Sequence, residues 1–237
     1  MKTFVMIGLI FVLNFGILVA EENKPDDSKK NPEAFNIPEV KEAYDNYVTS
    51  LNTTVGNYVK ILNKEEESQT KKGNLEILEK IKKERDEINV LEPVKSSVDW
   101  GKNNSLNLGK KSFNTGLEKN KKDYLNKLEM IQKKLVQDKK IDDAKIVRDY
   151  IEELKMEEVR KSILGQWQLY KNNQKDTIHT FKDNNEGVSS TGNRFTWKVV
   201  TINKIEQVWE SDKNKTVVIT IENNTLKWED GHSGRHL

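Results

Sequence analysis

The chain has 237 residues, of which 33% are charged, yet its 40 Lys and Arg nearly balance its 38 Asp and Glu. Proteins that bind nucleic acid usually carry a clear basic excess, so this balance argues against a nucleic-acid partner. The chain contains no cysteine, which excludes disulfides, thiol chemistry and attachment of a lipid to a cysteine.

The pattern of residues 1–20 predicts a secretory signal peptide. Lys2 precedes an apolar run, and the small residue Ala20 comes directly before two glutamates. We therefore expect cleavage after Ala20 and a secreted or periplasmic protein, with no stable membrane insertion after cleavage. Leu18 is larger than the residue usual at three positions before the cut, so an uncleaved membrane anchor is the alternative.

Residues 36–162 are predicted to form a helical domain, preceded by a disordered linker over residues 21–35. The linker is mostly polar and contains two prolines. The first helix is expected to begin near Pro38, because proline is favoured in a first helical turn. Gly73 tolerates a left-handed backbone and is expected in a turn, after which a second helix stops before Pro93.

Apolar residues at three- and four-residue steps predict two helical hairpins, over residues 38–91 and 111–161. The hairpins align without a gap at an offset of 66 residues, which places Tyr58 on Tyr124 (124 − 58 = 66). We interpret this match as a duplicated hairpin. Because either hairpin alone would leave its apolar face in water, the two are expected to pair into a four-helix bundle or an elongated coiled coil.

Residues 94–110 are expected to form an ordered loop between the hairpins. They contain two glycines, three asparagines and the single aromatic residue Trp100. We expect Trp100 to anchor the loop in the helical core, and a contact with a partner is the alternative.

Residues 163–237 form the predicted β-domain, because the helical period ends at Ser162 and an alternating pattern begins. Six short strands separated by turn residues predict an antiparallel meander, either a small barrel or a strongly curved sheet. Phe195 and Trp197 fall on one face of their strand. The predicted fold class is therefore α+β, an antiparallel helical bundle followed by a small antiparallel β-domain.

The second hairpin also carries a family resemblance. Its tyrosine-led helix, polar turn and the run IDDAKIVRDYIEEL over residues 141–154 resemble the helical segment of uncharacterised exported proteins of the planctomycete and lentisphaera type. In those proteins the segment precedes a small tryptophan-rich β-domain. This chain has Lys139 or Lys140 where the turn glycine of those proteins stands. The resemblance implies the same two-part architecture, and it implies no activity.

The opening of the β-domain, LGQWQL, resembles the first strand of small lipocalin-like β-domains. In those domains a Gly-x-Trp motif closes one end of the barrel, and Gly165 and Trp167 would hold its positions. Such domains usually end with more strand than residues 231–237 supply, so an open sheet is the alternative to a closed barrel.

The chain contains none of the common catalytic motifs, so we predict no enzyme, no cofactor and no metal. His232 and His236 stand four residues apart, a spacing that metal ligands adopt on a helix, but the neighbouring glycines place them in a loop or tail. The acidic pair Asp142 and Asp143 is better explained by the dipole at the start of a helix than by acid–base chemistry.

Aromatic residues of the β-domain provide the candidate ligand site, because tryptophans on a sheet stack on sugar rings or line a cavity for an apolar ligand. The candidate ligand-binding residues are Trp209, Trp228, Trp197 and His179. A place in the core is the favoured interpretation for Trp197, and a place in the barrel wall is favoured for His179. Both interpretations stay open for Trp209 and Trp228.

Two functions follow from these patterns. The first is an exported non-enzymatic protein, with a helical scaffold or interaction region and a small β recognition domain that meets a protein partner or a cell-envelope component. The alternative is a lipocalin-like or carbohydrate-binding module that holds a small apolar ligand or a glycan.

Overall fold

The computed structural model describes residues 33–88, 93, 95–222 and 225–237, and the side chains of 212–215 are not described. The predicted signal peptide and most of the predicted linker therefore lie outside the described residues. Within these residues, no helix is both long enough and apolar enough to cross a membrane.

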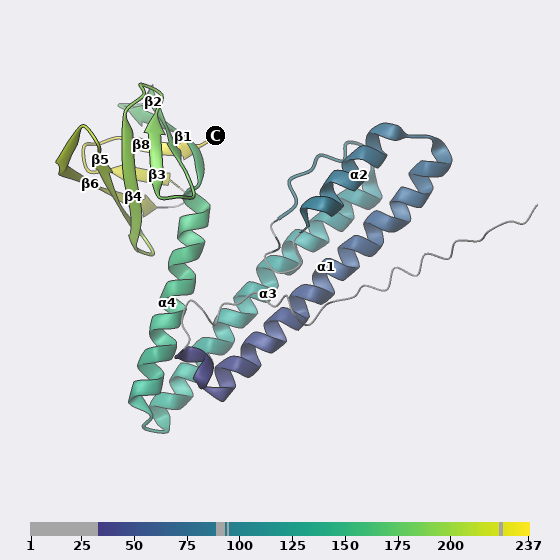
Figure 1. The fold of residues 1–237 in the computed structure, drawn as a ribbon, viewed down its shortest axis with the longest axis horizontal. Helices are drawn as coiled ribbons and strands as arrows, with labels where there is room; N and C mark the ends of the chain where they lie inside the picture. Colours follow the sequence, from purple (N-terminus) through teal and green to yellow (C-terminus); the bar gives the residue numbers. More distant parts are fainter. Residues whose placement is uncertain (1–32, 89–92, 94, 223–224) are drawn as a thin grey trace, which may run out of the picture. The chain divides into compact units, whose positions relative to one another are not determined.

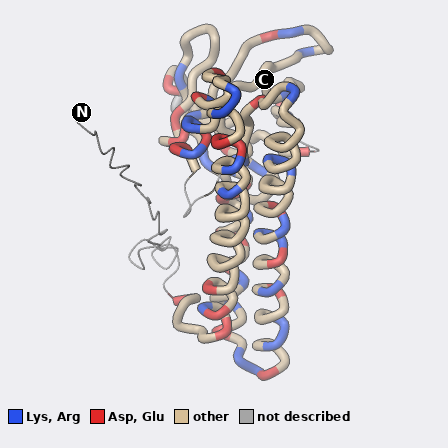
Figure 2. Tube along the Cα trace, turned by 90° about the vertical axis from the view of Figure 1, so that its right-hand side faces the viewer, with Lys and Arg blue, Asp and Glu red and all other residues tan. Residues whose placement is uncertain are grey.

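In the described part of the chain, four α-helices precede a closed antiparallel β-barrel (Figure 1). This arrangement confirms the predicted α+β class. The helices, after a short 3-10 helix η3 (Ala34–Asn36), are α1 (Pro38–Lys72), α2 (Leu75–Glu87), α3 (Asn104–Gln137) and α4 (Ile141–Ile163). Figure 2 shows positive and negative residues interspersed along these helices, as expected of faces in water.

Helix starts confirm one sequence prediction and correct two. Helix α1 begins at Pro38, as expected. Helix α3 begins at Asn104, so the second half of the loop predicted over residues 94–110 is helical. Residues 34 and 35, assigned to the linker, belong to η3, where Ala34 is fully buried.

The two helical hairpins turn with the same backbone geometry. Gly73 and Lys139 are both left-handed, with φ of 66° and 63°, and they differ by the predicted offset (139 − 73 = 66). In each turn this residue donates its N–H to the carbonyl three residues earlier, and the next residue donates to the carbonyl five residues earlier. The offset also relates the starts of α1 and α3 (104 − 38 = 66). The equivalence of the hairpin turns is therefore confirmed.

The described residues fall into two compact units, and the division cuts through α1 and α3. The first unit comprises Asn46–Asn120, and the second comprises residues 33–45 together with Lys121–Leu237. The predicted boundary between a helical domain and a β-domain at residue 162 stays a prediction.

The first unit has a core of aliphatic and aromatic side chains from α1, α2, α3 and the segment before α3. Trp100 is 1% exposed in this core, so its predicted anchoring role is confirmed. Tyr58 stacks on Phe113 at 4.5 Å between ring centroids and donates a 3.0 Å hydrogen bond to the buried carboxylate of Glu84.

Within the second unit, the α3–α4 hairpin has a buried tyrosine at the position equivalent to Tyr58, but its hydrogen-bond partner is another tyrosine instead of a carboxylate. Tyr124, the equivalent of Tyr58, shares a 3.1 Å hydrogen bond between hydroxyls with Tyr150, the equivalent of Glu84 (150 − 84 = 66). Phe35 of η3 packs edge-on against Tyr150 at 5.6 Å between ring centroids. The duplicated positions therefore keep their burial but exchange a carboxylate for an aromatic ring.

The barrel closes because its first and last strands pair, Trp167 lying opposite His236. Its strands are β1 (Gly165–Lys171), β2 (Gln174–Phe181), β3 (Glu186–Ser189), β4 (Arg194–Thr201), β5 (Lys204–Trp209), β6 (Asp212–Glu222), β7 (Thr225–Trp228) and β8 (Ser233–His236). Strands β3 and β8 are additions to the six predicted strands. The placement of residues 231–237 in a loop or tail is therefore wrong for most of that segment.

Helix α4 enters the barrel at one end and is fixed there by side chains of the second unit. Ile163, the last residue of α4, is buried in the barrel core, and its carbonyl accepts a 2.7 Å hydrogen bond from the indole of Trp167. Arg160 lies over the ring of Trp197 at 6.0 Å and pairs with Asp183 at 2.9 Å. These contacts leave the other end of the barrel free of α4.

Candidate ligand site at the end of the barrel

A pocket of about 190 Å³ lies at the barrel end away from α4. Strand register separates the two ends: Gly165 pairs with Phe181 beside α4, whereas Lys171 pairs with Gln174 at the other end. We call this cavity the barrel-end pocket, and the side chains that define it here are Asp176, His179, Trp209, Trp228, Asp230 and His232.

His179 forms an aromatic wall of the pocket with two tryptophans. Its ring lies 5.3 Å from that of Trp209 and 5.7 Å from that of Trp228, both in edge-to-face geometry. The side chain is 4% exposed, and its Nδ1 has no hydrogen-bond partner among the described residues. Burial, with a smaller contribution from nearby His232, lowers the pKa of His179 to about 4, so the ring is neutral at pH 7.

An imidazole held between two carboxylates forms the polar side of the pocket. His232 places Nε2 at 2.9 Å from Oδ2 of Asp176 and Nδ1 at 2.7 Å from Oδ1 of Asp230. Burial alone would raise the pKa of Asp230, but hydrogen bonds from the ring and backbone of His232 bring that pKa below its usual value. The two aspartates come from β2 and from the turn after β7, so closure of the barrel brings them together.

Trp228 is fixed in the barrel wall by a buried amide. Its indole N–H donates a 3.0 Å hydrogen bond to Oε1 of Gln207, whose side chain is fully buried. Trp209 has no comparable hydrogen bond among the described residues and is only partly buried. The two tryptophans therefore present a fixed ring and a more accessible ring to the pocket.

The other residues singled out from the sequence lie elsewhere. Trp197 is 2% exposed in the barrel core, and its indole donates to the carbonyl of Glu186 at 3.1 Å. His236 lies on β8 at the α4 end, where its Nε2 bonds to the carbonyl of Leu164 at 2.9 Å. No group of three His, Cys, Asp or Glu side chains among the described residues is arranged to hold a metal ion.

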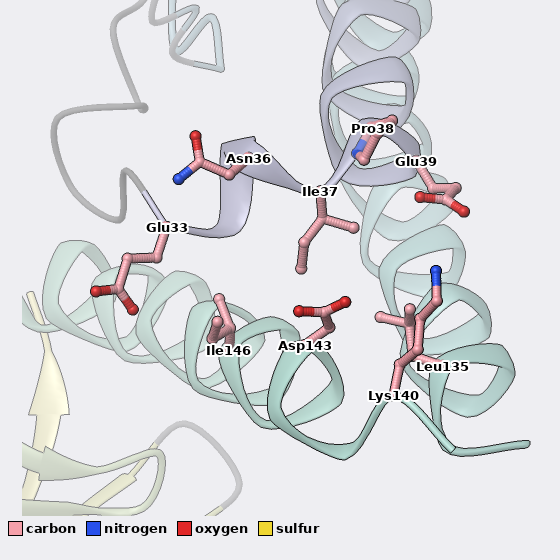
Figure 3. A pocket seen from close by; sticks show the side chains of 9 residues that line it. All are labelled: Glu33, Asn36, Ile37, Pro38, Glu39, Leu135, Lys140, Asp143 and Ile146. Carbon is pink, nitrogen blue, oxygen red and sulfur yellow. The ribbon is translucent and has the colours of Figure 1, made fainter. Parts of the chain in front are cut away.

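A second pocket, of about 250 Å³, lies between η3 and the α3–α4 turn (Figure 3). Figure 3 shows the apolar side chains of Ile37, Leu135 and Ile146 around it, with the carboxylate of Asp143 beside Ile37. The sequence patterns indicated no functional residue at this place.

The sequence patterns did not indicate Asp176 and Asp230 of the barrel-end pocket, and they raised His232 only as a possible metal ligand, an interpretation set aside because of the neighbouring glycines. Each is next to residues typical of turns, and the sequence analysis interpreted such residues as connections. The available signal was the position of two charged residues: Asp176 directly precedes one predicted strand, and Asp230 directly follows another.

Comparison with known proteins identifies no relative: no family model, no curated protein and no solved structure matches the chain. The structural class of this protein is therefore assigned from its fold alone. In the described residues, two helical hairpins precede a closed antiparallel barrel that is compatible with a lipocalin-like fold.

Proposed function

We propose that this protein is an exported, non-enzymatic binding protein whose barrel recognises a glycan at the barrel-end pocket. The observation that carries the proposal is the meeting of a partly buried tryptophan, Trp209, with the carboxylates of Asp176 and Asp230 in one small cavity. An aromatic face for the ring and acceptors for the hydroxyls are the two features that a sugar requires.

The packing of the barrel interior favours a glycan over a large apolar ligand. Side chains including Trp167, Phe181, Phe195 and Trp197 fill the interior and are each at most 4% exposed. An apolar ligand of lipocalin type needs an internal cavity of several hundred Å³, whereas the barrel-end pocket is about 190 Å³ and partly polar. A single sugar ring at the barrel end suits this volume better.

The helical hairpins serve, in this proposal, as a scaffold or as a surface for a protein partner or a cell-envelope component. Export rests on the pattern of residues 1–20, and the resemblance to exported planctomycete proteins agrees with it. A glycan of the cell envelope would place ligand and protein in the same compartment.

Tryptophan fluorescence of the full chain tests the proposal during titration with soluble neutral, amino and acidic sugars. We expect saturable binding that Trp209→Ala abolishes. Tyr170→Ala is the matched control, because Tyr170 follows pocket-lining Leu169 on β1, is only half-buried and carries Arg235 over its ring. Binding that survives Trp209→Ala, or the absence of binding by every sugar, would refute the proposed site.

A further inference from the structure

The charged side chains of the barrel-end pocket indicate which charge its ligand carries, a property that the proposed glycan class leaves open. The described lining side chains that carry or gain charge are Asp176, Asp230, His232 and His179. Because His179 is neutral at pH 7, His232 is the base among them that can offset the two carboxylates, and outside the pocket lining the charge of Lys171 also acts on Asp230.

The geometry of His232 sets the net charge of this group. A neutral imidazole has one N–H and can donate to one carboxylate, whereas an imidazolium donates to both. Both ring nitrogens lie within 2.9 Å of a carboxylate oxygen. The described group therefore carries one negative charge when His232 is protonated and two when it is neutral. It is negative in either state.

His179 provides an independent sign that a ligand completes the pocket. The ring lines the cavity, is 96% buried (100 − 4), and has an Nδ1 without a hydrogen-bond partner among the described residues. Buried polar nitrogens in folded proteins nearly always have a partner. In the tautomer protonated at Nε2, this nitrogen is an acceptor, and an N–H or O–H of a ligand is its complement.

We infer that the ligand carries a positively charged amino group, as a 2-amino sugar does, with its ring against Trp209 and its ammonium facing Asp176 and Asp230. This inference rests on the proposed function, since it uses the same pocket. The electron-rich faces of Trp209 and Trp228 favour a nearby cation as well, so the aromatic and acidic sides of the pocket select the same group.

Calorimetric titration of the full chain with glucosamine, glucose and glucuronic acid tests the inference. At low ionic strength we expect glucosamine to bind about tenfold more tightly than glucose, and glucuronic acid to bind more weakly than either, because the group attracts cations and repels anions. Raising the salt to about 0.5 M should remove most of this preference, since the Debye length then falls to a few Å. The comparison of sugar affinities at low and high salt uses the parent chain alone.

Asp176→Asn should reduce the preference for glucosamine to less than about threefold, because it removes one charge and keeps the shape of the side chain. Asp142→Asn is the matched control: its side chain is 93% exposed on α4 and does not line the pocket, so the preference should be unchanged. Equal, salt-independent affinities for glucosamine and glucose would overturn the inference and leave the glycan site standing. Binding of none of the three sugars would refute the glycan site itself.

Discussion

In the α3–α4 turn, a lysine stands where the backbone conformation favours glycine. The equivalent turn between α1 and α2 has a glycine at that position. Lys139 has φ of 63°, and Gly73, its equivalent, has φ of 66°. A left-handed conformation costs an L-residue about 1–2 kcal/mol, and glycine avoids this cost. Glycine in turn loses about 0.5–1 kcal/mol more backbone entropy on folding. We therefore expect Lys139→Gly to stabilise the folded chain by about 0.5–1 kcal/mol.

The reverse change at Gly73 should destabilise the chain. A Cβ at this position meets no atom within 4 Å, so the effect of Gly73→Ala is conformational, and the same two terms with opposite signs give a net cost of about 0.5–1 kcal/mol. Urea unfolding of the full chain, followed by far-UV circular dichroism, measures both effects. Asp138→Gly is the control, because Asp138 precedes Lys139 with a negative φ and should lose about 0.5–1 kcal/mol. A loss for Lys139→Gly equal to that for Asp138→Gly would refute the argument from the turn.

Three further predictions follow from buried groups. Tyr58→Phe should cost about 1–3 kcal/mol in urea unfolding, because it removes the hydrogen bond to the buried carboxylate of Glu84. Burial raises the pKa of Tyr58 to about 12, so its ultraviolet ionisation step should lie above those of exposed tyrosines and vanish in this variant. The folded chain keeps His179 neutral down to about pH 4, whereas the unfolded chain protonates it near pH 6.5. Lowering the pH across this range should therefore cost up to about 3 kcal/mol of stability, and the His179→Phe variant should not show this loss. Leu62→Ala and Leu128→Ala should each cost about 2–5 kcal/mol in urea unfolding, because both side chains are fully buried.

The predictions for the two leucines and for His179 each have an outcome that contradicts them. Lys60→Ala and Asn126→Ala, two residues before the leucines and exposed, should stay within about 0.5 kcal/mol of the parent chain. A Leu62→Ala variant as stable as Lys60→Ala would show that this leucine contributes nothing to its core. Parallel pH profiles for the parent chain and His179→Phe would show that protonation of His179 is not coupled to folding.

Helical periodicity predicted the hairpins well, because their buried residues recur at three- and four-residue steps. It failed at the start of α3, where the first turns contain glycine and asparagine and bury little apolar surface. There Leu106 is fully buried, whereas Leu108 is 68% exposed. The offset of 66 was the stronger signal: applied to Pro38, it gives Asn104 as the start of α3.

The missed strands β3 and β8 each place a glycine where a side chain would mark the alternation. A Cβ at Gly187 would lie 2.1 Å from the ring of Phe195, and one at Gly234 would lie 2.8 Å from the ring of Trp228. Both positions are therefore occupied by aromatic rings from neighbouring strands. Such strands show no hydrophobic pattern because their partners supply the apolar surface.

The same feature explains why half of the barrel-end pocket could be predicted and half could not. Trp209, Trp228 and His179 are identifiable because their residue types are informative wherever they stand. Asp176 and His232 acquire meaning only when β8 pairs with β1, which brings the turn after β7 beside the start of β2. Within β8, Gly234 makes room for the ring of Trp228, because a Cβ there would lie 2.8 Å from that ring. The glycine that hides β8 from pattern analysis is therefore the residue that accommodates a tryptophan of the pocket against this strand.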